Sequence, residues 1–255
     1  MTRRRWIADE VTGDTAALLG EHALHLSRVL RARVGQQFDI AIGSDSKSCG
    51  NSKVRRGTIT AISADRVEFA LGDRLDNSPS SISQITLALS IFKFDRMEWA
   101  IEKCTEIGVV RIVPVIARRS DPHLVAASLK RHDRWQRIVS QAAEQSRRSA
   151  PPEIMSPVKL KDLPAALPAG AVTRIVLAES LANADAEAEE SRLSDILQSH
   201  PTEAMLATGP EGGWADDELA WFRAAGWIAA SLGPTILRAE TAAIVATAIV
   251  MDALR

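Results

Sequence analysis

The sequence predicts an α/β protein in which a parallel sheet with covering helices follows a smaller, mostly β domain. From residue 85 onward, short apolar runs alternate with helical patterns, which is typical of a parallel sheet. Residues 37–71 instead carry β-branched and apolar runs separated by turn-rich stretches. Between the two regions, residues 77–81 (NSPSS) have the composition of a linker. We therefore expect one domain over residues 1–75 and a second over residues 76–255.

The first domain is expected to be mostly β. Its predicted strands are residues 37–42, 54–62 and 66–71. Residues 43–53 (GSDSKSCGNSK) form a long polar loop between the first two strands. A helix is expected over residues 22–32, with Arg28 and Arg31 outside its apolar face. That face consists of Leu26, Val29 and Leu30.

The second domain is expected to alternate strands with helices. Its predicted strands are residues 85–91, 109–116, 174–178, 204–207 and 228–232. A helix over residues 95–107 ends at Gly108, because glycine suits the C-terminal cap of a helix. A longer helix covers residues 130–148. Its inward-facing residues are Trp135, Ile138, Val139 and Ala142.

The last predicted helix, residues 242–251 (AAIVATAIVM), is apolar at every position except Thr247. A helix that is apolar all round must be covered on all sides. Two arrangements satisfy this: a central helix of a large domain, or a helix covered partly by a partner chain. Its late position in the sequence favours a homodimer.

Composition and cysteine use exclude several classes of protein. The 255 residues are 46% apolar and 25% charged, as in ordinary globular proteins. The two cysteines, Cys49 and Cys104, cannot build a disulfide framework, and no Cys/His spacing suggests a zinc site. Neither a signal peptide nor an apolar run of membrane-spanning length is present. We expect a cytoplasmic protein that binds no metal and no membrane.

Charge is distributed unevenly along the chain. Residues 1–75 hold twelve Lys/Arg against nine Asp/Glu, although the whole chain has a net charge of −1. Residues 118–148 hold eight Lys/Arg against three Asp/Glu. Basic surfaces can bind a phosphate backbone, but many are simply solvated faces. Charge alone therefore leaves both interpretations open.

Two glycine-bearing loops follow two of the predicted strands, at residues 209–213 (GPEGG) and 232–238 (LGPTILR). Loops that leave neighbouring parallel strands would border a cleft at the carboxyl edge of the sheet, where open α/β sheets bind ligands. The first loop lacks the Lys-Ser/Thr ending of a phosphate loop, and no G-x-G-x-x-G follows a strand. We therefore expect a ligand that is not held mainly by phosphates; two ordinary turns are the alternative.

Few charged residues accompany these loops: Glu211, Arg238 and Glu240, with Thr241 as a hydroxyl donor. The two carboxylates could instead serve the first turns of the helices that follow. A ligand with a planar base, a ribose and an amino-acid tail would suit such backbone-lined loops. S-adenosylmethionine has this chemistry, though the pattern alone does not select it.

The GPEGG loop followed by LGPTILRAETAA resembles the signature of the ribosomal RNA small-subunit methyltransferase E (RsmE) family. That family belongs to the SPOUT class of S-adenosylmethionine-dependent methyltransferases. Three further segments carry the resemblance, in order, over nearly the whole chain. They are HLSRVLR at residues 25–31, KFDRMEWAIEKCTEIGVVRIVPVIARRS at residues 93–120 and AAEQSRRSAPPEI at residues 142–154.

The resemblance implies a PUA-like, RNA-binding β-barrel followed by a SPOUT domain with a deep trefoil knot at its C-terminal end. It also implies a homodimer in the cytoplasm that uses S-adenosylmethionine. The implied substrate is N3 of one uridine near the 3′ end of 16S rRNA in the assembled 30S subunit. Methylation of another rRNA or tRNA base is an alternative, and so is a non-catalytic RNA-binding assembly factor. An enzyme that binds another nucleotide is disfavoured by the missing phosphate loop.

The resemblance also implies residue roles. Cofactor contacts are expected from Leu177, Thr208, Gly209, Pro210, Glu211, Gly212, Gly213, Leu232, Gly233, Ile236, Leu237, Arg238, Glu240 and Thr241. The catalytic candidates are Glu211 and Glu240 as bases, with Arg148 and Arg238 stabilising charge on the uracil. RNA contacts are expected from Arg4, Arg5, Arg28, Arg31 and Arg147. The chain departs from the family pattern at three positions, where Arg147 replaces glycine, Thr235 replaces arginine and Ala239 replaces threonine.

Overall fold

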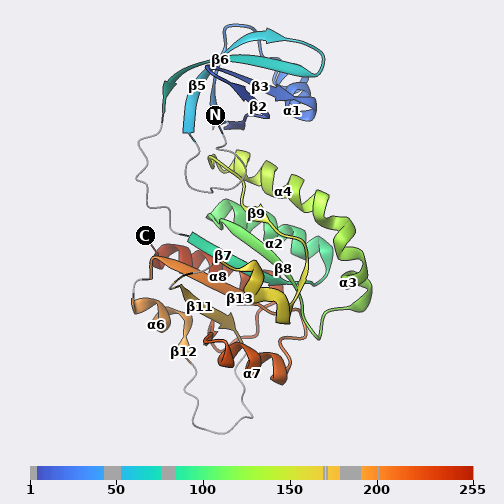
Figure 1. Cartoon of the computed structure of the whole chain (residues 1–255), viewed down its shortest axis with the longest axis vertical. Helices are drawn as coiled ribbons and strands as arrows, with labels where there is room; N and C mark the ends of the chain where they lie inside the picture. The colour runs from blue at the N-terminus through green and yellow to red at the C-terminus, as the bar shows by residue number, and fades with distance from the viewer. Residues whose placement is uncertain are drawn as a thin grey trace. The chain divides into compact units, whose positions relative to one another are not determined.

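The computed structural model describes residues 5–42, 53–75, 84–168, 170, 172–178, 191–199 and 201–254 (Figure 1). Contacts within the chain divide it into two compact units. The first consists of Met1–Ile82 together with Ser140–Pro151, and the second of Ser83–Val139 together with Pro152–Arg255. Each unit has its own buried core.

The first unit is built on a mixed sheet with the strand order β1-β4-β5-β6-β3-β2. Strand β1 pairs in parallel with β4, and the other neighbours are antiparallel. The strands are β1 (Trp6–Ile7), β2 (Glu10–Thr12), β3 (Thr15–Leu19), β4 (Gln37–Ile42), β5 (Lys53–Ile62) and β6 (Arg66–Arg74). The three predicted strands are thus confirmed. Most of the predicted loop at 43–53 lies outside the described residues.

The helix expected over residues 22–32 is shorter and partly of a different type. Helix α1 (Gly20–Leu24) continues into a π-helical turn, η1 (His25–Val29). Leu26 is fully buried, but Val29 and Leu30 are 66% and 50% exposed, so the predicted common face is wrong. The Leu30 N–H donates to the carbonyl five residues earlier, as in a π-turn. This wider turn rotates the last two apolar side chains away from Leu26.

The segment Ser140–Pro151, which includes the end of helix α4 (His132–Gln145), groups with the first unit. His22 Nε2 lies 3.3 Å from Glu144 Oε1, and His22 Nδ1 lies 3.2 Å from Asp9 Oδ2. Arg5 Nη1 donates to the carbonyl of Arg147 at 2.6 Å. Several polar contacts therefore hold the segment that carries Arg147.

The second unit contains the predicted parallel sheet, with the strand order β10-β8-β7-β13-β11-β14-β12 and β9 beside β8. Every pair among these described strands is parallel. The strands are β7 (Gln84–Ser90), β8 (Arg111–Ile116), β9 (Glu153–Ile154), β10 (Val158–Lys159), β11 (Thr173–Leu177), β12 (Ser191–Arg192), β13 (Glu203–Thr208) and β14 (Ile228–Ser231). The central strands are apolar on both faces, as expected of a covered parallel sheet.

Helices and short 3-10 turns connect these strands. They are α2 (Phe94–Ile107), α3 (Pro122–Ser128), η2 (Leu129–Arg131), α4 (His132–Gln145), η3 (Leu160–Asp162), α5 (Leu163–Ala166), α6 (Leu193–Ile196), η4 (Leu197–Ser199), α7 (Asp216–Ala224) and α8 (Ala239–Ala253). Helix α2 ends at Gly108, as predicted. The expected helix over residues 130–148 starts at His132 and ends at Gln145, and its Trp135, Val139 and Ala142 are buried.

Two hydrophobic clusters cover the two faces of the sheet. One cluster joins alternate sheet residues, such as Leu87 and Leu206, to helices α2, α4 and α8. The other joins the intervening residues, such as Ala88 and Met205, to helices α5 and α7 (Figure 1). Successive side chains of a strand point to opposite faces, so one strand supplies both clusters.

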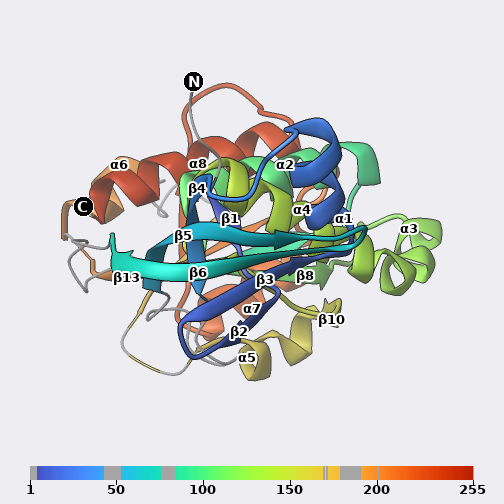
Figure 2. The ribbon, with the colours of Figure 1, turned by 90° about the horizontal axis from the view of Figure 1, so that it is seen from above.

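Helices α2 and α8 lie side by side on one face of the sheet (Figure 2). Helix α8 buries Ala243, Ala246 and Val250 against the core. Its Val245 and Ile249 remain 36% and 37% exposed, so the described part of the chain does not enclose α8 as a central helix. Among the described residues, the alternative of a central core helix is therefore wrong.

Thr247, the polar residue of the α8 run, is buried between the two helices. Its hydroxyl lies 3.6 Å from Cys104 Sγ on helix α2. Burial raises the pKa of the Cys104 thiol to about 12, against a smaller opposing effect of this contact. Cys104 is thus a buried apolar side chain.

Candidate functional site

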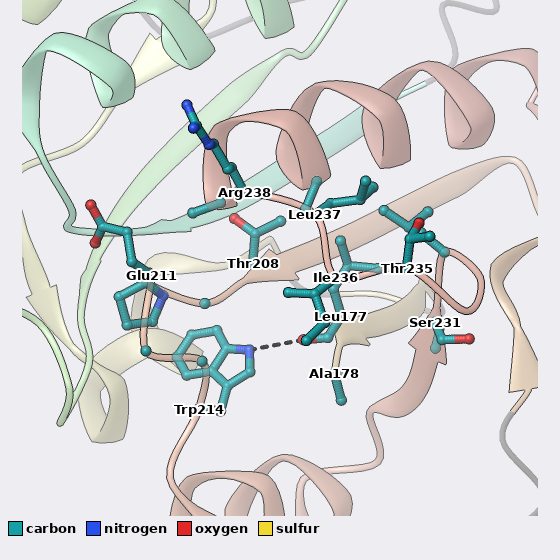
Figure 3. Close-up of a pocket in the computed structure, with 18 of the residues that line it drawn as sticks. Leu177, Ala178, Thr208, Glu211, Trp214, Ser231, Thr235, Ile236, Leu237 and Arg238 are labelled. Carbon is teal, nitrogen blue, oxygen red and sulfur yellow. Dashed lines mark hydrogen bonds between the residues drawn. The ribbon is translucent and has the colours of Figure 1, made fainter. Parts of the chain in front are cut away.

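A cavity of about 580 Å³ opens at the carboxyl edge of the parallel sheet (Figure 3). Strand β11 lies between β13 and β14, and the three strands are parallel, so their following loops meet at one edge. The sequence suggested that β13 and β14 are direct neighbours, but β11 separates them. The lining comprises Leu177 and Ala178 at the end of β11, residues 208–214 at and after the end of β13, residues 230–239 around the end of β14, and Arg96, Arg119, Leu219 and Ala242.

The GPEGG loop folds tightly over Trp214. The indole Nε1–H donates to the Leu177 carbonyl at 3.1 Å, which ties this loop to the end of β11. A Cβ at Gly209 would lie 3.3 Å from Trp214 Nε1 and 3.4 Å from the backbone of Gly213. The first of these distances is tighter than most Cβ contacts, so glycine favours the close turn. The loop therefore presents backbone to the cavity.

The second loop crosses the opposite side of the cavity. Gly233 has φ +124°, a conformation that residues with a side chain rarely adopt. Beyond it, Pro234, Thr235 and Ile236 are exposed, and Ile236 exposes 80% of its surface. An apolar side chain this exposed at a cavity rim offers a surface on which a planar, apolar ligand group can pack.

One buried hydroxyl at the cavity has no partner among the described residues. Thr208, at the end of β13, is 1% exposed, lines the cavity, and leaves its Oγ1 without a hydrogen bond. Buried polar groups are normally satisfied, so this hydroxyl is free to bond a ligand. Apolar side chains, loop backbone and the hydroxyls of Thr208, Ser231 and Thr235 suit a nucleoside and agree with an adenosyl cofactor. Neither glycine loop of the lining has the Lys-Ser/Thr ending of a phosphate-binding loop.

The charged candidates differ in their access to the cavity. Glu211 lines it and accepts the Lys93 N–H at 3.3 Å. Arg238 also lines it, and the two side chains extend toward the same side of the cavity (Figure 3). Glu240 is 5% exposed, lies 3.6 Å from Arg96 Nη1, and is not part of the lining. Of the two candidate bases, only Glu211 reaches the cavity.

Most of the residues predicted to bind the cofactor come together around this cavity. All of them line it except Glu240 and Thr241, in the first turn of α8. Arg148 is half-buried and belongs to the first unit. The RNA-contact candidates Arg5, Arg28, Arg31 and Arg147 also belong to the first unit, while Arg4 lies outside the described residues.

Sequence reasoning missed two arginines of the lining, Arg96 and Arg119. Arg119 Nη1 donates to the Gly212 carbonyl at 2.8 Å and thereby holds the GPEGG loop. Both arginines follow carboxyl ends of strands, β7 and β8. This position in the sequence could have marked both arginines as site candidates, because the carboxyl ends of parallel strands share one edge of the sheet.

Two further observations concern the described residues alone. No helix among them is long and apolar enough to span a membrane. They also contain no group of three or more His, Cys, Asp or Glu residues arranged to hold a metal ion.

Comparison with known proteins decides the family. A model of the RNA methyltransferase domain matches residues 78–251. Ribosomal RNA small subunit methyltransferase E of Synechocystis is 31% identical over 249 residues, covering 97% of this chain and 77% of the relative. The same enzyme of Mycobacterium bovis is 33% identical, covering 92% and 85%. The chain belongs to the ribosomal RNA small subunit methyltransferase E family.

Solved methyltransferase structures share the fold over nearly the whole chain. Ribosomal RNA small subunit methyltransferase E from Neisseria gonorrhoeae, bound to S-adenosylmethionine, matches with a TM-score of 0.79 at 30% identity. The match covers 96% of this chain and 95% of that one. A methyltransferase structure from Legionella pneumophila, in complex with the same cofactor, matches with a TM-score of 0.78 at 28% identity, covering 98% and 97%. The family assigned from the sequence and the α/β class with a parallel sheet are confirmed.

Proposed function

We propose that this protein transfers a methyl group from S-adenosylmethionine to N3 of one uridine near the 3′ end of 16S rRNA. The assembled 30S subunit is the proposed substrate. The observation that carries the proposal is the cavity bounded by both glycine loops, in a chain that belongs to this methyltransferase family. Two solved relatives hold the cofactor named here.

The cavity lining would hold the cofactor mainly through backbone and apolar contacts. The adenosyl group would pack among Leu177, Leu232 and Ile236, with Thr208 Oγ1 bonding one of its polar atoms. We retain the full predicted set, including Glu240 and Thr241, as the proposed cofactor-binding residues. When bound, the cofactor supplies a methyl group on a positively charged sulfur.

Uridine N3 carries a proton at neutral pH, so a base must remove it before the nitrogen can attack the methyl carbon. Glu211 lines the cavity and is the best placed of the proposed bases; Glu240 is the second candidate. The N3 proton would pass to the carboxylate, the N3 electron pair would form the bond to carbon, and the carbon–sulfur bond would break. Arg238 and Arg148 would stabilise the charge that develops on the uracil carbonyl oxygens.

The first unit would mainly contact RNA, and the second would hold the cofactor. Residues 1–75 would form the PUA-like module that contacts RNA, with Arg4, Arg5, Arg28 and Arg31, and with Arg147 from the associated segment. Residues 76–255 would form the SPOUT domain. The parallel order β13-β11-β14, with both glycine loops leaving one edge, supports the proposed trefoil knot. A recognised base must leave its stack to enter such a cavity.

A homodimer in the cytoplasm would cover the exposed stripe of helix α8. Val245 and Ile249 lie on this stripe and are more than one-third exposed. Replacing Ile249 with Arg should give a monomer in light-scattering measurements, whereas replacement of the exposed Val11 in the first unit should not. A dimer that persists in Ile249→Arg would remove α8 from the interface.

Methyl transfer to purified ribosomal material tests the main proposal. Labelled S-adenosylmethionine is offered with 30S subunits or with naked 16S rRNA, and the modified nucleoside is identified by mass spectrometry. The expected product is 3-methyluridine, formed on 30S subunits. A different methylated base, or transfer to tRNA, would replace the proposed substrate; binding of RNA and cofactor without transfer would indicate an assembly factor.

A further inference from the structure

The start of helix α2 contacts Glu211 of the first glycine loop and Glu240, which follows the second loop in helix α8. At its start, the Lys93 N–H donates to Glu211 Oε1 of the first loop at 3.3 Å. One turn later, Arg96 Nη1 lies 3.6 Å from Glu240 Oε1, just beyond the second loop. Arg96 itself lines the cavity. A single arginine therefore lies where the two walls of the cavity approach each other.

Most hydrogen-bonding capacity of Arg96 is available to a ligand. A guanidinium carries five N–H donors, and Glu240 is the acidic partner of Arg96 among the described residues. Their separation of 3.6 Å exceeds the usual length of a charged hydrogen bond, about 2.7–2.9 Å. The Arg96 side chain is 35% exposed, so it is restrained but still reachable from the cavity.

Glu240 is suited to hold this guanidinium in place. Its side chain is 7% exposed and belongs to the first turn of helix α8, whose following residues are packed in the core. Its Oε2 has no hydrogen-bond partner among the described residues. A buried carboxylate needs a nearby cation, so Glu240 keeps Arg96 at the edge of the cavity.

We propose that Arg96 binds the carboxylate of the cofactor's amino-acid tail and that Glu240 is its positioning residue. This inference rests on the proposed function. The tail carboxylate is the one anionic group of S-adenosylmethionine, and a guanidinium matches a carboxylate with two parallel hydrogen bonds. Of the other lining arginines, Arg119 is engaged with the Gly212 carbonyl, and Arg238 is exposed and not held by an acidic residue among those described.

Restraint by Glu240 also favours binding energetically. A free arginine side chain loses rotamer freedom when it grips a ligand, and a preset one loses less. RNA phosphates are the other oxyanions that could reach a cavity arginine. An RNA strand would approach from solvent, where Arg119 and Arg238 are exposed arginines of the lining. The half-buried Arg96 therefore fits an anion that enters with the cofactor.

Two ligands that differ in the tail test the proposal by calorimetry. S-adenosylhomocysteine carries the amino-acid tail, and 5′-methylthioadenosine shares its adenosyl thioether but lacks the tail. Arg96→Lys keeps the positive charge but removes the planar guanidinium, whose paired N–H groups can donate two parallel hydrogen bonds. We expect it to weaken S-adenosylhomocysteine binding about tenfold, with methylthioadenosine changed by less than about twofold.

Glu240→Gln provides a second variant that keeps the size of the side chain. It should weaken S-adenosylhomocysteine binding about three- to tenfold and change methylthioadenosine binding by less than about twofold, because Glu240 does not line the cavity and would contribute to cofactor binding through Arg96. Lys103→Ala is the matched control, since it removes a charge from the far end of α2, outside the cavity lining. It should change neither affinity, and circular dichroism checks that each variant is folded.

Three results would overturn the inference. Equal weakening of both ligands would mean that Arg96 only shapes the loops. Unchanged affinities with a raised KM for 30S subunits would assign Arg96 to an RNA phosphate. Unchanged affinities and an unchanged KM would leave it no role in binding. Failure of the unaltered protein to bind either ligand is a distinct result, which would refute the proposed function itself.

Discussion

Replacing Gly233 with Ala isolates the backbone contribution of the second glycine loop. A Cβ at this position would meet no atom within 4 Å, so the substitution introduces no steric contact. Its φ of +124° nevertheless lies where residues with a side chain are strained, at a cost of about 1–3 kcal/mol. The loop is exposed beyond Gly233, so we expect it to relax rather than hold the strained shape.

Relaxation of the loop would remove part of the cavity wall before any ligand arrives. If the bound state must restore the strained backbone, the affinity falls by the same 1–3 kcal/mol, which is about 5- to 150-fold. Calorimetry with S-adenosylhomocysteine measures this directly. We expect nearly unchanged thermal stability together with the weaker binding, because the strain is relieved in the free protein.

Gly226→Ala is the matched control. Gly226 also has a positive φ, +76°, and no atom within 4 Å of an added Cβ, but it lies between α7 and β14, outside the cavity lining. This variant should lose stability and keep its affinity for S-adenosylhomocysteine. Wild-type affinity in Gly233→Ala would refute the conclusion that the second loop forms part of the binding site.

Three further predictions concern named contacts. Trp214→Phe removes the donor to the Leu177 carbonyl and should cost about 1 kcal/mol in denaturant titrations, with weaker ligand binding; an unchanged midpoint would contradict this. Burial raises the pKa of Cys104 to about 12, so the unfolded chain loses this thiol proton first and stability should fall between about pH 9 and 12; Cys104→Ala should lack this fall in pH-dependent unfolding. Burial acts to raise the pKa of Asp9, but hydrogen bonds from His22 and from the Leu19 N–H lower it, and the net pKa lies below 3.8. The ionised Asp9 therefore stabilises the folded protein above pH 3.8, and this contribution is lost as the pH falls below that value. In Asp9→Asn, the melting temperature should depend less steeply on pH in this acidic range.

The strands of the parallel sheet could be predicted because their signal is local. Residues 85–91 and 204–207 are short apolar runs bounded by polar residues, and they form β7 and β13 with shifts of one residue at each end. The strand order could not be predicted in this way. Strand β11 lies between β13 and β14 because of pairings between residues far apart in the chain, which no local pattern encodes.

The candidate site was predictable where glycine and a family resemblance marked it. The loops around Gly209 and Gly233 were found from the sequence, and both line the cavity. Arg96 and Arg119 were not found, because each resembles an ordinary surface arginine in its local sequence. Their positions depend on tertiary contacts, with Glu240 for the first and Gly212 for the second.

The cavity is assembled from parts that the ribosome makes at very different times. Strand β7 and helix α2 are synthesised early in the second unit, whereas β13, both glycine loops and α8 come after residue 202. Helix α8 nevertheless packs directly on α2. If the cavity is the cofactor site, as proposed, a nascent chain would bind no cofactor there until these late segments have emerged and docked. Cofactor binding would then stabilise only chains in which this unit has folded, and would protect them from degradation.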